Sequence, residues 1–225
     1  MDIKNLTISY SDKKVFDCFN LSFEKGKVTA ILGSSGVGKT TLLRAISSLV
    51  DYDGQIIGAG KISYMFQEAR LIPTLTVKDN LLYALNDEQK FSKLEDLNKL
   101  IQMVGLCGEE DSFPDELSGG MESRVSLIRA FLVDSDTLLM DEPLRSLDLV
   151  TKQKILFDMK TILAEYPRTV ILVSHDPREC VYLADRIIVL SGSPACVVLD
   201  ENAVKNMTES EIVAFENKLV SCIGD

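Results

Sequence analysis

Short apolar and β-branched runs alternate with glycine-rich turns over the first third of the chain, a pattern that predicts β-strands. Five strands are expected, over residues 3–9, 15–23, 27–32, 55–57 and 61–66. Because these runs follow one another with only turns between them, we expect them to form an antiparallel sheet.

From residue 135 onward the pattern changes to apolar strands that alternate with helical stretches. The strands are expected at 137–140, 169–173 and 186–190, and the helices at 147–164 and 177–184. Strands and helices in alternation predict a parallel, doubly wound α/β core. The antiparallel sheet is then expected beside this core.

The middle third lacks strand signals, and its apolar residues recur at helical spacing. We therefore expect a helical subdomain over residues 68–133, inserted into a single domain that spans 1–225. A helical tail is expected over 200–225, because Thr208 and Glu211 form a capping-box pattern ahead of an amphipathic run.

Charge bears on which partners the chain can bind. It carries 24 Lys and Arg against 34 Asp and Glu, a formal net charge of -10. A surface this acidic repels a phosphate backbone, so nucleic acid is not an expected partner.

Other classes are disfavoured by local sequence. No apolar run approaches the roughly 18 residues that a membrane-spanning helix needs, and the first residues lack the basic head and apolar block of a secretory signal. The five cysteines include no C-x-x-C pair, so a zinc site or redox pair is not expected. We expect a cytoplasmic protein with reduced thiols.

A phosphate-binding loop is the strongest chemical motif. It fits G-x-x-x-x-G-K-[ST] between a predicted strand and a predicted helix, the context in which backbone N–H groups converge on phosphates. Lys39 is expected to reach the β- and γ-phosphates and to assist catalysis, and the Thr40 hydroxyl to ligate Mg²⁺. The expected nucleotide-binding residues are Gly33, Ser34, Ser35, Gly36, Val37, Gly38, Lys39, Thr40 and, opening the helix, Thr41.

Two adjacent carboxylates, Asp141 and Glu142, end the strand predicted at 137–140. Successive side chains of a strand point to opposite faces, so the two can take different tasks. We expect Asp141 to hold the Mg²⁺ shell and Glu142 to orient or deprotonate an attacking water. Paired acids are also common as solvated strand ends, but the phosphate loop in the same chain favours the catalytic interpretation.

His175 is the only histidine. A lone histidine is usually structural, but this one follows an apolar strand at the edge that is also expected to carry Asp141 and Glu142, which favours a catalytic role. The three residues Asp176, Pro177 and Glu179 are expected to be the N-cap, the first-turn proline and the capping partner of the next helix.

These motifs together resemble the ATP-binding subunits of ABC transporters, and the resemblance covers nearly the whole chain. Five motifs occur in the order that the family has them, which is far more specific than one motif. The segment 117–120, Leu-Ser-Gly-Gly, is similar to the family's signature motif, 141–143 to its second nucleotide motif, Ser146-Leu147-Asp148 to its D-loop, Gln67 to its Q-loop glutamine and 173–176 to its switch-histidine segment.

The resemblance implies roles for further residues. Tyr10 would stack on adenine, Gln67 would contact nucleotide and Mg²⁺, and His175 would contact the γ-phosphate. ATP would be held between the phosphate loop of one copy and Ser118, Gly119 and Gly120 of a second copy, with Asp148 at the same nucleotide interface. A homodimer is therefore expected when ATP is bound.

The resemblance also implies partners outside the chain: transmembrane permease subunits and a solute-binding protein, with this subunit on the inner face of the cell membrane. Met121 after Ser-Gly-Gly, and the segment 66–73, resemble the importer branch for nitrate, sulfonate and taurine. At Leu144 and Arg145 the chain departs from the family's usual aromatic and small residue.

Three alternatives to a transport subunit are disfavoured by the sequence. A soluble ABC-type ATPase acting on DNA or ribosomes would be expected to have long heptad arms or a second such domain, and the chain has neither. A nucleotide switch without catalysis is disfavoured by the presence of Asp141, Glu142 and His175. A small-molecule kinase would have no use for a second phosphate grip at 118–120.

Overall fold

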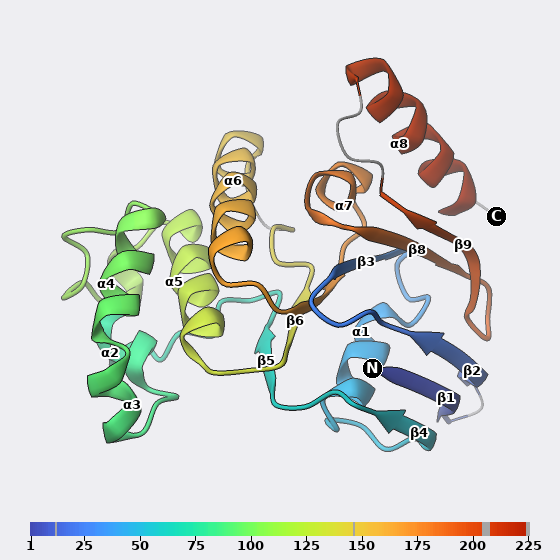
Figure 1. The fold of residues 1–225 in the computed structure, drawn as a ribbon, viewed down its shortest axis with the longest axis horizontal. Helices are drawn as coiled ribbons and strands as arrows, with labels where there is room; N and C mark the ends of the chain where they lie inside the picture. The colour runs from blue at the N-terminus through green and yellow to red at the C-terminus, as the bar shows by residue number, and fades with distance from the viewer. Residues whose placement is uncertain (12, 146, 204–207, 224–225) are drawn as a thin grey trace.

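The computed structural model describes residues 1–11, 13–145, 147–203 and 208–223. The described chain folds around two β-sheets, one of six strands and one of three (Figure 1). The predicted fold class is confirmed: an α/β protein with a mostly parallel sheet and a separate antiparallel sheet.

The six-stranded sheet forms the centre of the molecule. Its first five strands pair in parallel, and the last strand pairs antiparallel to its neighbour. In sheet order the strands are β5 (Ile62–Met65), β6 (Thr137–Asp141), β7 (Thr169–Val173), β3 (Val28–Gly33), β8 (Arg186–Ser191) and β9 (Cys196–Asn202).

The three-stranded antiparallel sheet has the order β2 (Lys13–Ser22), β1 (Asp2–Tyr10) and β4 (Asp53–Ile57). The expectation that all five early strands form one antiparallel sheet is therefore wrong, because β3 and β5 belong to the parallel sheet. Strand β3 is buried along most of its length, as is typical of a strand covered on both faces. A connection through turns alone does not fix which strands pair.

The helices divide between the inserted segment and the parallel core. Those between β5 and β6 lie together at one end of the molecule (Figure 1): α2 (Val77–Leu82), α3 (Asp87–Ser92), α4 (Leu94–Met103), a 3-10 turn (Pro114–Glu116) and α5 (Gly119–Leu132). The remaining helices are α1 (Lys39–Ile46), α6 (Leu149–Glu165), α7 (Pro177–Leu183) and α8 (Glu209–Ile223).

Two hydrophobic cores lie on the two faces of the parallel sheet. Along β3, Ala30 and Leu32 pack into the core formed with α5 to α8, whereas Ile31 packs into the core formed with α1 and the small sheet. This is the alternation that a pleated strand dictates. Residues of β3, β6 and β7 lie in both cores. Packing on both faces therefore holds these strands in place, and the loops that follow them begin at defined positions.

Capping of the last two helices is predicted by the sequence. Thr208 and Glu211 form the reciprocal bonds, with the Thr208 amide donating to Glu211 Oε2 at 2.7 Å and the Glu211 amide to Thr208 Oγ1 at 3.4 Å. At α7, Asp176 accepts from the Arg178 amide, as predicted. Glu179 is not the capping partner, however: its carboxylate is buried and pairs with the side chain of Lys152.

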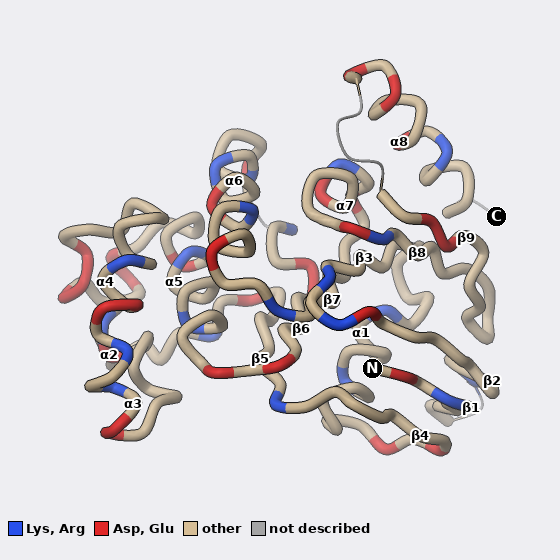
Figure 2. Tube along the Cα trace, in the orientation of Figure 1, with Lys and Arg blue, Asp and Glu red and all other residues tan. Residues whose placement is uncertain are grey.

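No helix in the described part of the chain is long and apolar enough to cross a membrane. Lys and Arg are spread along the described chain and interspersed with Asp and Glu, rather than gathered in one stretch (Figure 2).

Candidate functional site

The phosphate loop joins β3 to α1, as the sequence predicts. Its glycines allow a backbone that other residues cannot follow: Gly38 has φ 117°, and a Cβ there would lie 2.6 Å from Val15 Cγ1. The loop is thereby packed directly against β2. The loop leads directly into the N-terminus of α1, where the helix dipole favours an anion.

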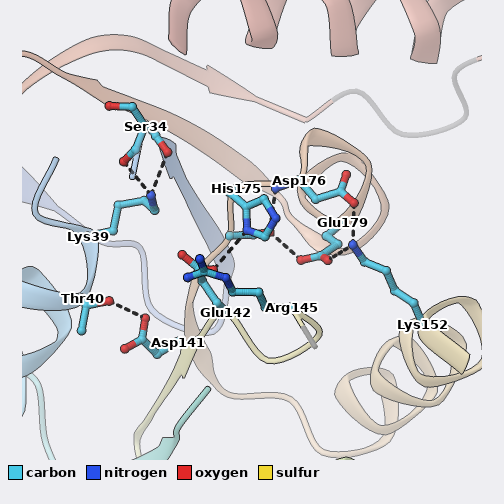
Figure 3. A network of polar contacts seen from close by, with 12 residues as sticks. Ser34, Lys39, Thr40, Asp141, Glu142, Arg145, Lys152, His175, Asp176 and Glu179 are labelled. Atoms are coloured by element: carbon cyan, nitrogen blue, oxygen red, sulfur yellow. Dashed lines mark hydrogen bonds and ion pairs between the residues drawn. The ribbon is translucent and has the colours of Figure 1, made fainter. Parts of the chain in front are cut away.

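Lys39 begins α1 and is only 5% exposed. Its ammonium turns back over the loop and donates to the carbonyl oxygens of Gly33 at 2.7 Å and Ser34 at 3.0 Å (Figure 3). Burial lowers the pKa of Lys39, although the nearby carboxylates of Glu142 and Asp141 oppose this shift. A buried cation held only by carbonyl groups is a strong attractor for phosphate.

Asp141 meets two hydroxyl groups at the end of β6. Thr40 Oγ1 donates to Asp141 Oδ1 at 2.8 Å, and the Tyr64 hydroxyl donates to Oδ2 at 3.2 Å. Burial, together with the charge of Asp141 and this hydrogen bond, raises the pKa of Tyr64.

These oxygen donors fit Mg²⁺, which takes oxygen ligands and usually completes its shell with water and substrate phosphates. No cluster of three or more His, Cys, Asp or Glu side chains that could hold a metal occurs among the described residues. A magnesium ion here would therefore depend on the phosphates as well as on the protein.

Glu142 and His175 come together across neighbouring strands. Asp141 at the end of β6 pairs with Val173 at the end of β7, so the residues that follow both strands lie at one sheet edge. His175 Nδ1 lies 3.1 Å from Glu142 Oε2 (Figure 3). Arg145 Nη1 lies 3.1 Å from the same oxygen. The predicted base and the predicted switch histidine are thus in direct contact.

One cavity of about 330 Å³ gathers most of the predicted site. Tyr10, at the end of β1 and 47% exposed, lies at this cavity with Gln67 and Glu142. The predicted residues that line it are Tyr10, Ser35, Gly36, Gly38, Lys39, Thr40, Thr41, Gln67 and Glu142. Ser34 and Val37 line a neighbouring cavity of about 170 Å³, which Ser35 and Gly36 also border.

Ser118, Gly119, Gly120 and Asp148 do not line this cavity in the described part of the chain. They lie at the starts of two packed helices. Ser118 Oγ caps α5 by accepting from the Met121 amide, and Asp148 caps α6 by accepting from two backbone amides. Ser146 of the predicted D-loop lies outside the described residues.

The starts of α5 and α6 are in close contact. A Cβ added to Gly120 would lie 2.5 Å from Thr151 Cγ2. The starts of α5 and α6 are therefore packed together, and neither Ser118 nor Asp148 lines the cavity at the phosphate loop.

A buried polar network connects α6 to the residues around His175. Lys152 Nζ lies 2.6 Å from both Asp176 Oδ2 and Glu179 Oε1, and Ser174 Oγ donates to Glu179 Oε2 at 2.5 Å (Figure 3). Burial alone would raise the pKa of Asp176, but the hydrogen bond from Lys152 and the Arg178 amide outweigh it and hold that pKa below its usual range.

Sequence reasoning did not place Tyr64, Arg145 or Lys152 at the site. Tyr64 falls at an alternating position of β5, and only the pairing of β5 with β6 brings it to Asp141. The sequence did draw attention to Arg145, because ATP-binding subunits of ABC transporters usually have a small residue at this position. Lys152 lies four residues after Asp148, but its partners are distant in sequence, so spacing alone could not find them.

The sequence is similar to known ATP-binding proteins of transporters. The family model described as ABC transporter matches residues 16–145. An aliphatic sulfonates import ATP-binding protein of Rhodococcus jostii is 39% identical over 98% of this chain and 91% of its own length. One from Bacillus cereus is 38% identical over 80% of the chain and 75% of its own length. A spermidine/putrescine import ATP-binding protein of Spiroplasma citri is 32% identical over 99% of the chain and 74% of its own length.

Proposed function

The chain belongs to the ABC transporter family, and we propose that it is the subunit that hydrolyses ATP to drive uptake of a small solute. One observation carries the catalytic part of the proposal. Lys39 and Glu142 line a single cavity, and Glu142 contacts His175 beside it. A phosphate-binding cation, a carboxylate base and a polar group to contact phosphate are thereby within one site.

Binding of the triphosphate rests on the phosphate loop and the start of α1. The backbone N–H groups between Gly33 and Thr41 would surround the phosphates, and Lys39 would exchange its carbonyl partners for phosphate oxygens. Tyr10, which is exposed and lines the cavity, is proposed to stack on the adenine. Base stacking on an aromatic ring contributes about 1 to 3 kcal/mol.

Thr40, Asp141 and Gln67 would hold Mg²⁺ beside the phosphates. When bound, the ion neutralises charge that develops on the phosphate oxygens. Thr40 Oγ1 lies 2.8 Å from Asp141 Oδ1, and Gln67 lines the same cavity as Thr40.

Glu142 is the group proposed to accept a proton from the attacking water. His175 would orient the reaction by a polar contact to the γ-phosphate. Both lie at the carboxyl edge of the parallel sheet, where α/β proteins generally place their ligands.

A second copy of the chain is proposed to complete the site. Ser118, Gly119 and Gly120 begin a 14-residue helix whose backbone N–H groups favour an anion. They lie apart from the cavity of their own chain, so we assign them, with Asp148, to the ATP held by a partner subunit. Closure of two copies around ATP would exclude water and strengthen the electrostatic interactions inside.

Transport itself requires subunits that cross the membrane. We propose that residues 68–133 form the helical subdomain and that its segment 70–115 contacts a permease on the inner face of the cell membrane. A solute-binding protein would deliver the solute from the other side. The region, rather than a single residue, is the proposed contact.

The solute is proposed to be a small organic anion of the aliphatic sulfonate class. Support comes from the sulfonate-import relatives of Rhodococcus and Bacillus, and from Met121 in the signature segment. The polyamine-import relative is less similar, at 32% identity.

The catalytic proposal is tested by Glu142→Gln. Loss of a general base typically costs about 100- to 10,000-fold in rate, so turnover of ATP by the purified chain should fall by about that factor while ATP binding is retained. Unchanged turnover would remove Glu142 from this role.

The solute proposal needs its own assay. Membrane vesicles that contain this subunit and its cognate permease should accumulate a labelled aliphatic sulfonate when ATP is supplied inside, and vesicles with the Glu142→Gln subunit should not. Accumulation of a polyamine but no sulfonate would contradict the proposed solute class.

A further inference from the structure

The turn after β6 directs Arg145 back toward the base. The Arg145 amide donates to the Glu142 carbonyl oxygen at 3.2 Å, which closes a tight turn over Pro143 and Leu144. Glu142 itself has φ 47°, in the left-handed region that an ordinary residue avoids. The turn hydrogen bond and this φ value define the backbone here, and the side chains of Glu142 and Arg145 lie next to each other.

The Arg145 and His175 side chains both contact the same oxygen of Glu142. Arg145 Nη1 and His175 Nδ1 each lie 3.1 Å from Glu142 Oε2. A carboxylate offers about four lone-pair sites on its two oxygens, so contacts at Oε2 leave those of Oε1 open to a water. Because a base needs a lone pair directed at the water it activates, contacts that fix Oε2 limit how the carboxylate can turn toward that water.

Arg145 also faces the nucleotide cavity. Its side chain is 48% exposed, against 12% for Glu142, and it lines the cavity together with Lys39 and Gln67. The Arg145 charge contributes to the lowered pKa of Lys39, after the larger effect of burial. A guanidinium binds a carboxylate with its planar fork, so the Arg145 side chain is suited to hold Glu142 at the edge of this cavity.

We propose that Arg145 is a positioning residue that holds the Glu142 carboxylate by its Oε2 atom before nucleotide binds, and that release of this ion pair lets the carboxylate turn toward the attacking water. The inference rests on the proposed function, in which Glu142 is the base. Arg145 is therefore expected to affect the rate of hydrolysis, kcat, whereas Lys39 and the phosphate loop are expected to affect the affinity for ATP.

Steady-state ATP hydrolysis by the purified full chain tests the restraint. Arg145→Met removes the guanidinium, and since a solvent-exposed ion pair contributes at most about 1 kcal/mol, kcat should rise about two- to fivefold. The KM for ATP should stay within about twofold. Arg145→Lys keeps a cation and should remain near the wild-type rate.

A matched control is Arg178→Met. Arg178 is an exposed arginine on α7 that pairs with Glu216 at 3.4 Å, away from the Glu142 carboxylate. Its replacement should leave kcat unchanged. In the Glu142→Gln background, Arg145→Met should give no gain, because the group it releases is gone.

Two results would overturn the proposal: an unchanged kcat in Arg145→Met, or a lower kcat with a raised KM, which would make Arg145 a phosphate ligand. Absence of ATP hydrolysis by the wild-type chain would instead contradict the proposed function. In that case a double-mutant cycle of thermal unfolding with Arg145→Met and Glu142→Gln still measures the ion pair, and strictly additive effects would overturn it.

Discussion

Asp141 and Glu142 are neighbours in sequence but contact different partners. Asp141 accepts hydrogen bonds from Thr40 and Tyr64, and Glu142 contacts His175 and Arg145. The change of direction follows from the left-handed φ of Glu142, whose backbone N–H donates a hydrogen bond to the Val173 carbonyl oxygen at 2.9 Å. The two carboxylates are thereby turned into different surroundings, as their different proposed roles require.

The Tyr64 hydroxyl is expected to orient Asp141. Removal of such a partner of a metal ligand typically costs about 10- to 100-fold in metal affinity or activity. Tyr64→Phe should therefore raise the Mg²⁺ concentration that gives half-maximal ATP hydrolysis by about tenfold. A titration of rate against Mg²⁺ measures this, with Tyr182→Phe, on the exposed side of α7, as control. Equal midpoints in both variants would exclude the role.

At the residue scale, sequence predicted best where chemistry requires a residue type at fixed spacing. The phosphate loop, Asp141, Glu142 and His175 were found in this way, and the structure places them at or next to one cavity. Their roles stay predictions. Tyr64 and Arg145 could not be assigned, because strand pairing and a turn, rather than spacing, bring them to the carboxylates.

At the scale of elements, ion pairs of Lys152 link α6 to the start of α7, next to His175. Lys152, in the first turns of α6, bridges Asp176 and Glu179 on either side of the start of α7. Asp148 caps the same helix, so the first turns of α6 are linked through Lys152 to Asp176, the residue after His175 in sequence.

Lys152→Met leaves two carboxylates without their cation. Removal of one partner of a buried ion pair costs about 3 to 5 kcal/mol, and because Lys152 retains some exposure we expect a loss of about 3 kcal/mol in unfolding free energy at pH 7. Chemical denaturation measures it, with Lys154→Met on the exposed face of α6 as control.

The pH dependence of this loss has a definite sign. The pKa of Asp176 is lowered in the folded chain, so its contribution is present above its unfolded value of about 3.9 and disappears as pH falls through the folded value. The difference between the wild type and Lys152→Met should therefore shrink below about pH 4. A constant difference down to pH 2 would contradict the assignment.

The contact between α5 and α6 can be tested at Gly120. A Cβ there would lie 2.5 Å from Thr151 Cγ2, and Thr151→Ser removes that methyl group. Neighbouring residues typically couple by about 0.5 to 3 kcal/mol, so we expect Gly120→Ala to be about 1 kcal/mol less costly in the Thr151→Ser background. Thermal unfolding of the four proteins measures the coupling, and additive effects would contradict the contact.

Most elements could be predicted from hydrophobic periodicity, and β7 matches the expected range residue for residue. The sequence did not show that β3 and β5 join the parallel sheet, because the apolar pattern of a strand indicates that it is buried but does not indicate which strand lies next to it. The role of Glu179 was missed for a related reason: its position after Asp176 fits a capping box, but its buried carboxylate pairs instead with Lys152 of another helix.

At the scale of the whole molecule, the residues proposed to hold ATP form two separate surfaces. The phosphate loop and the sheet edge form one, and Ser118, Gly119, Gly120 and Asp148 form the other. The comparisons and the fold establish an ABC transporter ATPase, whereas the joining of the two surfaces across a dimer is the central claim of the proposed mechanism.

Light scattering of the Glu142→Gln chain with saturating ATP and Mg²⁺ tests that claim most directly. The account predicts a particle of twice the 24.9 kDa chain mass, and a return to the monomer when Ser118→Arg is added, because a bulky cation then blocks the second surface. A Glu142→Gln chain that binds ATP yet stays monomeric, alone and with its permease, would contradict it.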